Sequence, residues 1–147
     1  MKHAAMGLAE WSEWVPLQEA HVRAPLWPGV YLVRSGSAGP VVYAGLAGVR
    51  SGKGLRGRIQ KYSSGLASGL SEAALDRALA DPVWLRARLA EVEDGRPMRA
   101  AEWAKAALKR AKVYMCWTVT TTAKEAEVLE LQVIAALGAG LWNRDKQ

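Results

Sequence analysis

Two stretches in the first third of the chain carry the pattern of paired β-strands. Residues 29–34 (Gly-Val-Tyr-Leu-Val-Arg) and 40–45 (Pro-Val-Val-Tyr-Ala-Gly) are rich in β-branched and aromatic side chains, and they flank a turn of serine, glycine and alanine. This pattern predicts a β-hairpin. Because successive side chains of a strand point to opposite faces, Tyr31 and Tyr43 can share one face of the hairpin.

A short helix is predicted after a loop over 46–53. Its apolar stripe recurs at helical spacing and consists of Leu55, Ile59 and Tyr62. Arg56 and Lys61 lie on the polar side of this helix, and Arg58 borders the apolar stripe. The helix therefore presents a basic side.

Two longer segments lie outside these elements. Residues 1–27 predict a lead-in of one or two short helices that packs on the domain through Trp11, Trp14 and Trp27. Residues 63–111 predict two or three helices, in which Asp81-Pro82 marks a helix start and Gly95 a stop. This second segment carries no recognisable chemical motif.

A third strand and a final helix close the chain. Residues 112–120 have the composition of a strand, and Thr121 or Thr122 can cap a helix that runs to about Leu137 before two glycines. At 100° per residue, Glu130 lies at the centre of an apolar stripe formed by Ala123, Ala126, Val133, Ile134 and Leu137. A carboxylate at this position is expected to face the core.

A buried carboxylate needs a partner. An unpaired buried charge costs several kcal/mol, so Glu130 must be paired, protonated or bound to a cation. An ion pair with an arginine such as Arg58 and a role as metal ligand explain this one residue equally well. The pattern alone leaves both open.

Length and composition limit the class of protein. The chain has 147 residues, the size of one ordinary domain, and contains no stretch of roughly 18 apolar residues that could span a membrane. No apolar run of signal-peptide length follows the N-terminus, so we expect a cytoplasmic protein. The single cysteine, Cys116, cannot form an internal disulfide and is expected to be packed, and two histidines are too few for a Cys/His zinc cluster.

The charge of the chain indicates a polyanionic partner. The net charge is +6 and the pI is near 9.7, and an excess of lysine and arginine attracts nucleic acid. Five basic residues and no acidic one lie in the glycine-rich stretch 50–61. Besides Arg58, the predicted nucleic-acid contacts are Arg50, Lys53, Arg56 and Lys61. Glycines in this stretch allow the backbone to approach a phosphate.

Several of these pieces, taken in order, resemble a known family. Gly29-Val30-Tyr31 and Tyr43-Ala44-Gly45, then the sequence at 55–59, then Val128-Leu129-Glu130 and Leu141-Trp142-Asn143 resemble the motifs of the GIY-YIG nuclease superfamily. The chain is similar in particular to the nuclease module of the bacterial excision-repair subunit that makes the first incision. The resemblance covers 28–62 and 112–143. Val30 and Ala44 stand where the motif has isoleucines.

The resemblance implies both a fold and a site. The implied fold is α+β, a small three-stranded antiparallel sheet flanked by helices, in one domain over 1–147 with 1–27 as lead-in and 63–111 as helical insertion. The implied catalytic site consists of Tyr31, Tyr43, Arg58, Glu130 and Asn143. These side chains come from separate segments, so the fold has to bring them together.

The implied activity is metal-dependent hydrolysis of DNA phosphodiester bonds. One carboxylate, Glu130, suits a single Mg²⁺ or Mn²⁺ that keeps most of its waters and binds substrate phosphate. Arg58 can fork onto phosphate oxygens and is expected to lower the pKa of a neighbouring phenol. Tyr31 is then the candidate general base and Tyr43 the group that orients water or phosphate, while Asn143 connects strand and site or holds Tyr31.

Other functions have to be weighed beside this one. A non-catalytic nucleic-acid-binding module on the same fold is the main alternative, and a protein-interaction domain with an incidental basic surface is a more distant one. Residues 48–53 hint at a nucleotide-binding loop, but that motif requires four residues between its glycines and a Ser or Thr after the lysine, and this sequence has neither.

Overall fold

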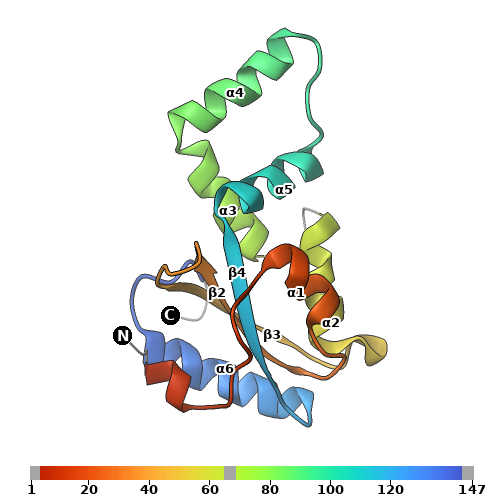
Figure 1. The fold of residues 1–147 in the computed structure, drawn as a ribbon, viewed down its shortest axis with the longest axis vertical. Coiled ribbons are helices and arrows are strands. Elements are labelled where there is room, and N and C mark those ends of the chain that lie inside the picture. Colours follow the sequence, from red (N-terminus) through yellow and green to blue (C-terminus); the bar gives the residue numbers. More distant parts are fainter. Residues whose placement is uncertain (1–3, 65–68, 144–147) are drawn as a thin grey trace.

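The computed structural model describes residues 4–64 and 69–143. They form an α+β fold (Figure 1). In chain order the strands and α-helices are β1 (Val15–Pro16), α1 (Leu17–Arg23), β2 (Gly29–Ser35), β3 (Val41–Ala47), α2 (Gly54–Gln60), α3 (Gly69–Leu79), α4 (Pro82–Glu93), α5 (Ala100–Arg110), β4 (Val113–Val119) and α6 (Ala123–Leu137). Short 3-10 turns occur at η1 (Ala4–Gly7), η2 (Arg50–Gly52) and η3 (Lys61–Ser64).

The sheet has four antiparallel strands, in the order β1-β4-β2-β3, where we predicted three. The additional strand β1 lies in the predicted lead-in, with Val15 opposite Met115 and Pro16 opposite Tyr114. Two residues are too few to show an alternating pattern. Proline also lacks the N–H that a central strand needs, which is why β1 lies at an edge.

Helices cover both faces of the sheet. Helix α6 packs against β2 and β3 on one face, and α1 and α2 pack on the other (Figure 1). Neighbouring side chains of β2 consequently enter different cores: Tyr31 and Val33 join the cluster with α1 and α2, and Leu32 joins the cluster with α6. Cys116 is buried in the second cluster, as predicted.

The hairpin places the two motif tyrosines on one face, as predicted. Tyr31 pairs with Gly45 and Val33 pairs with Tyr43, so the two tyrosines are diagonal neighbours. Their ring centroids lie 6.4 Å apart with an interplanar angle of 25°. This arrangement fixes both rings at the α2 side of the sheet.

Helix α6 begins and ends where local signals predict. The Thr122 side chain accepts a hydrogen bond from the Glu125 backbone N–H at 3.1 Å and so caps the first turn. Gly138, with φ of 70°, follows the last helical residue. Glu130 is 4% exposed, which confirms that this carboxylate faces inward.

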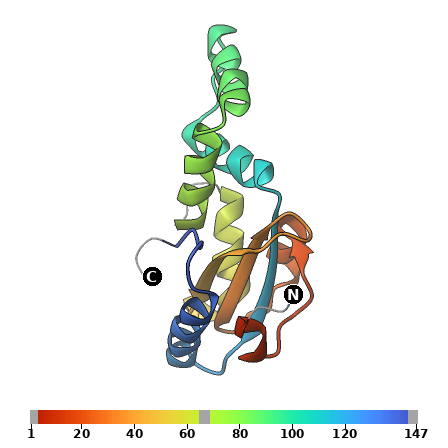
Figure 2. The same cartoon turned by 90° about the vertical axis from the view of Figure 1, so that its left-hand side faces the viewer.

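The predicted helical insertion contains α3, α4 and α5, which extend away from one end of the sheet (Figures 1 and 2). Residues 65–68 of this segment lie outside the described part. Asp81 caps α4 by accepting from the backbone N–H of Val83, and Gly95, with φ of 74°, follows the helix, as predicted. Trp84 and Trp103 meet edge to face with centroids 5.7 Å apart.

The lead-in packs on the sheet through two of its three tryptophans. Trp11 and Trp14 contact the cluster on the α6 side. Trp27 is 59% exposed, so its predicted packing is wrong. The structural contribution of Trp27 is its backbone carbonyl, which accepts from the Leu55 N–H at 2.9 Å. Among the described residues, no helix is long and apolar enough to cross a membrane.

Candidate active site

All five residues of the predicted catalytic set line one pocket of about 400 Å³. They come from β2, β3, α2, α6 and the segment after α6, and are Tyr31, Tyr43, Arg58, Glu130 and Asn143. More than a hundred residues separate Tyr31 from Asn143 in the sequence. The sheet and its two helical layers bring them together.

Gly45 explains how Tyr31 reaches the pocket. A Cβ at position 45 would overlap the Cζ and hydroxyl oxygen of Tyr31, and it would lie 2.8 Å from Cε1. The phenol of Tyr31 therefore crosses directly over the glycine that pairs with it. Because the Tyr31 side chain is fully buried, its ring has no other space to occupy.

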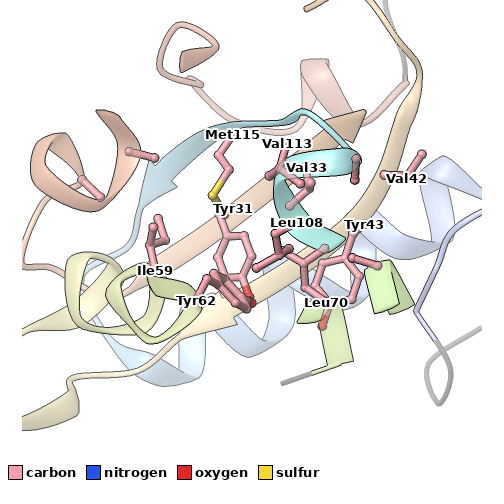
Figure 3. Close-up of a cluster of buried hydrophobic side chains, with 14 of the residues drawn as sticks. Tyr31, Val33, Val42, Tyr43, Ile59, Tyr62, Leu70, Leu108, Val113 and Met115 are labelled. Atoms are coloured by element: carbon pink, nitrogen blue, oxygen red, sulfur yellow. The ribbon is translucent and has the colours of Figure 1, made fainter. Parts of the chain in front are cut away.

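Tyr62, which the sequence predicts only as part of the core, contacts the site through Tyr31. Its hydroxyl forms a short hydrogen bond with the hydroxyl of Tyr31, and the two rings meet at 72° with centroids 6.2 Å apart (Figure 3). Tyr62 is 1% exposed. The sequence signal for Tyr62 was its position in the apolar stripe of the predicted helix that also carries Arg58.

The motif phenols hold their protons more tightly than free tyrosine does. Burial raises the pKa of Tyr31 well above its ordinary value, with further increases from Tyr62 and Tyr43, while Arg58 lowers it by less. Burial likewise raises the pKa of Tyr43. We expected Arg58 to leave a neighbouring phenol with a lowered pKa. The direction of its effect is right, but desolvation outweighs it.

Arg58 supplies the positive charge of the pocket. Its guanidinium is half-buried and its carbon lies 5.7 Å from the centre of the Tyr62 ring. Burial lowers the pKa of Arg58, but electrostatic interactions with Tyr31 and Tyr62 more than offset this and raise it overall. The side chain is therefore a permanent cation at the wall of the pocket.

The pocket contains a second carboxylate that sequence analysis missed. Glu72 lies in the first turn of α3 and lines the pocket together with Glu130. Nothing in the local sequence marks Glu72, because its proximity to the pocket depends on how the insertion packs beside β3. Glu130 acts electrostatically on Tyr43, whose pKa it helps to raise.

The donor set of the pocket suits a hard divalent cation. It offers carboxylate oxygens from Glu130 and Glu72. No group of three or more His, Cys, Asp or Glu that could form a metal cage occurs in the described residues. Mg²⁺ commonly binds through one or two carboxylates and keeps several waters. The two carboxylates thus fit the donor set of one such ion.

Asn143 fastens the end of the chain to the edge strand. Its Nδ2 donates to the Ala44 carbonyl at 2.7 Å and its Oδ1 accepts from the Ala44 N–H at 3.1 Å. The backbone N–H of Trp142 adds a bond to the Val42 carbonyl at 2.6 Å. Asn143 therefore holds β3 at the residue between Tyr43 and Gly45.

Three of the four predicted nucleic-acid contacts gather in a neighbouring pocket. Arg50, Lys53 and Lys61 line a hollow of about 500 Å³ on the other side of α2. Arg56 does not line it, because its Nε donates to the Ala24 carbonyl at 2.7 Å. Arg50 has φ of 52°, a left-handed conformation that non-glycine residues rarely adopt and that here presents a basic side chain.

Comparisons with known proteins returned no match: no protein-family model, no curated protein and no solved structure matches this chain.

Proposed function

We propose that this protein is a metal-dependent nuclease of the GIY-YIG type that hydrolyses phosphodiester bonds in DNA. The observation that carries the proposal is the convergence of Tyr31, Tyr43, Arg58, Glu130 and Asn143 on one pocket. Each side chain has an ordinary structural explanation when taken alone. Together they place a buried carboxylate, a permanent cation and hydroxyl groups around one pocket, and phosphoryl chemistry uses this combination of groups.

Glu130, together with Glu72 in the same pocket, is the proposed holder of one Mg²⁺ or Mn²⁺. When bound, such an ion supplies positive charge that stabilises the phosphate oxygens and makes water a better nucleophile. A carboxylate on a helix that packs against the sheet is a rigid ligand, because its position depends on the core and not on a loop.

The remaining roles follow from charge and proton occupancy. Arg58 binds a non-bridging phosphate oxygen as negative charge develops in the transition state. Because burial raises their pKa values, Tyr31 and Tyr43 keep their protons at neutral pH and act as hydrogen-bond donors to phosphate or to the leaving oxygen. We therefore propose Tyr31 as a donor and not as the general base. Asn143 is a positioning residue for β3.

DNA approaches the site across α2. This helix carries Arg58, which lines the catalytic pocket. Lys61 comes directly after the helix and lines the basic hollow together with Arg50 and Lys53. Lysine and arginine that bind phosphates fix the position of a duplex without reading its sequence. We expect binding through this hollow to weaken steeply with salt.

One observation favours the alternative of a non-catalytic DNA-binding module. The Tyr31 hydroxyl is fully buried and already bonded to Tyr62, so one motif group is less accessible than a reacting site requires. A binding module would use the basic hollow alone. Its signature is tight, salt-sensitive DNA binding without turnover at any divalent metal concentration.

The decisive experiment compares two glutamates of the same helix. Purified protein is incubated with supercoiled plasmid and Mg²⁺ or Mn²⁺, and nicking is followed on gels. Glu130→Gln should abolish nicking, whereas Glu127→Gln, an exposed position on α6, should leave it unchanged. Circular dichroism checks that both variants fold.

Each result has a defined meaning. Equal nicking by the two variants would contradict the assigned site. Absence of nicking by the wild-type protein, with retained salt-sensitive binding that requires Lys53 and Lys61, would establish the binding module instead.

A further inference from the structure

A third pocket is lined in part by Tyr62, whose hydroxyl is hydrogen-bonded to that of Tyr31. It has a volume of about 600 Å³ and is bounded by α1, η3, α5 and the start of β4. Its apolar lining includes Leu17, Leu108, Val113 and Tyr62. This size is within the range of about 300–1,000 Å³ found for small-molecule sites. None of the functions considered above uses this pocket.

Three lysines and no carboxylate line this pocket. Lys105 forms an ion pair with Glu102 at 3.0 Å. Within residues 4–64 and 69–143, no carboxylate lies at ion-pair distance from Lys109 or Lys112. Two positive charges thus remain uncompensated at the edge of an apolar cavity. A phosphate monoester carries a charge of about −1.5 to −2 at neutral pH, which matches them.

Lys112 also occupies an unfavourable backbone conformation. It follows α5 with φ of 52°, and its N–H bonds to the Lys109 carbonyl at 3.1 Å. Helices commonly end with glycine in this left-handed conformation, because a Cβ is disfavoured there. The conformation turns the chain from α5 into β4 and leaves a lysine at the pocket where glycine would be less strained. Strain of this kind is typical of functional positions.

We propose that this pocket binds a small phosphomonoester with an apolar or aromatic body. The body lies against Leu108, Val113 and Tyr62, and the phosphate is bound by Lys109 and Lys112. Lysine binds phosphate as a mobile point charge and needs no fixed geometry. The proposal is independent of nuclease activity. Its connection to the catalytic pocket is Tyr62, which contacts both the ligand and Tyr31.

Binding is tested with naphthyl phosphate, by isothermal titration calorimetry and backbone amide chemical shifts. Naphthol without the phosphate and inorganic phosphate without the aromatic body are the matched ligands. We expect naphthyl phosphate to bind at least about tenfold more tightly than either, with shifts at Val113 and Tyr114. Equal affinity of the three ligands would overturn the proposal.

Two double variants with the same change of charge separate this pocket from a generally basic surface. Lys109→Ala with Lys112→Gly should weaken naphthyl phosphate binding about tenfold or more, and the glycine should leave the melting temperature unchanged or higher. Lys53→Ala with Lys61→Ala, in the basic hollow beside α2, should leave this binding unchanged. Equal weakening in the two double variants would refute a specific site.

Competition then distinguishes the two sources of such a ligand. A free nucleoside monophosphate and a terminally phosphorylated oligonucleotide are titrated against bound naphthyl phosphate in the Lys53→Ala, Lys61→Ala background. The competitor that acts at the lower concentration identifies the source as a free nucleotide or as a strand end. Failure of both to compete would exclude a nucleotide as the source of the ligand.

Discussion

Replacing Gly45 by alanine should strongly destabilise the protein, because the new methyl group would occupy the space of the Tyr31 ring. The Cβ would overlap the end of the phenol and lie 2.8 Å from its Cε1. Tyr31 cannot move outward, since its side chain is fully buried, stacks on Tyr43 and is hydrogen-bonded to Tyr62. The backbone cannot move easily either, because β3 is paired with β2 and bonded through Ala44 to the C-terminal segment.

The size of the effect follows from these contacts. Overpacking of a core costs about 1–3 kcal/mol, and displacement of Tyr31 also breaks a buried hydrogen bond worth about 1–3 kcal/mol when a partner is left unsatisfied. We therefore expect the free energy of unfolding to fall by about 2–6 kcal/mol. For a chain of this length this corresponds to a decrease in melting temperature of about 6–19 °C.

Thermal and urea unfolding, followed by circular dichroism, measure this change. The matched control is Gly48→Ala, where the nearest atom to a Cβ is that of Ala123 at 3.5 Å, an ordinary contact. This control should change stability by no more than about 0.5 kcal/mol. A Gly45→Ala variant as stable as the control would refute the reasoning. So would an undiminished cost in a Tyr31→Leu background, where the overlapping atoms are absent.

Three further predictions concern other parts of the site and core. Asn143→Ala removes both hydrogen bonds to the Ala44 backbone, so the free energy of unfolding in urea should fall by about 1–3 kcal/mol. An unchanged value would contradict the stabilising role of these two bonds. The raised pKa values of Tyr31 and Tyr43 mean that the folded protein holds these protons more tightly than the unfolded chain. Their contribution to stability is therefore complete below the ordinary tyrosine pKa of about 10 and is lost as pH rises above it. Alkaline absorbance titration should show both phenols ionising only on unfolding, and their ionisation in folded protein would disprove this. Burial raises the pKa of Cys116 to about 12, so a thiol reagent should react only with denatured protein, and reaction at equal rates in both states would contradict the burial.

Local sequence patterns were sufficient for the central elements of the fold. The hairpin was predicted over 29–34 and 40–45 and is formed by β2 and β3, with β3 continuing to Ala47. The cap at Thr122 and the inward face of α6 at Glu130 also follow from short-range rules, since capping and helical periodicity involve neighbours a few residues apart. These signals need no knowledge of the tertiary structure.

The parts that could not be predicted depend on contacts between distant segments. Strand β1 has two residues and exists because β4 offers an open edge to Val15. Glu72 enters the candidate site only because α3 packs beside the hairpin, where a Cβ on Gly69 would lie 3.1 Å from the Tyr43 hydroxyl. No local pattern of carboxylates or glycines in the insertion marks these two residues as neighbours of the pocket.

The protonation of Tyr31 shows why a motif predicts membership of a site better than it predicts a chemical role. The sequence places Arg58 near the phenol, and a cation lowers the pKa of a neighbouring acid. Whether the pKa of the phenol is finally lowered or raised depends on how much water remains around the hydroxyl, which is a property of the packing as a whole. Here β2, α2 and η3 enclose the hydroxyl and Tyr62 occupies its hydrogen bond, so desolvation exceeds the influence of Arg58. A phenol in this state keeps its proton and can donate a hydrogen bond, but it is not available as a base, so a nuclease built on this pocket must obtain its base elsewhere.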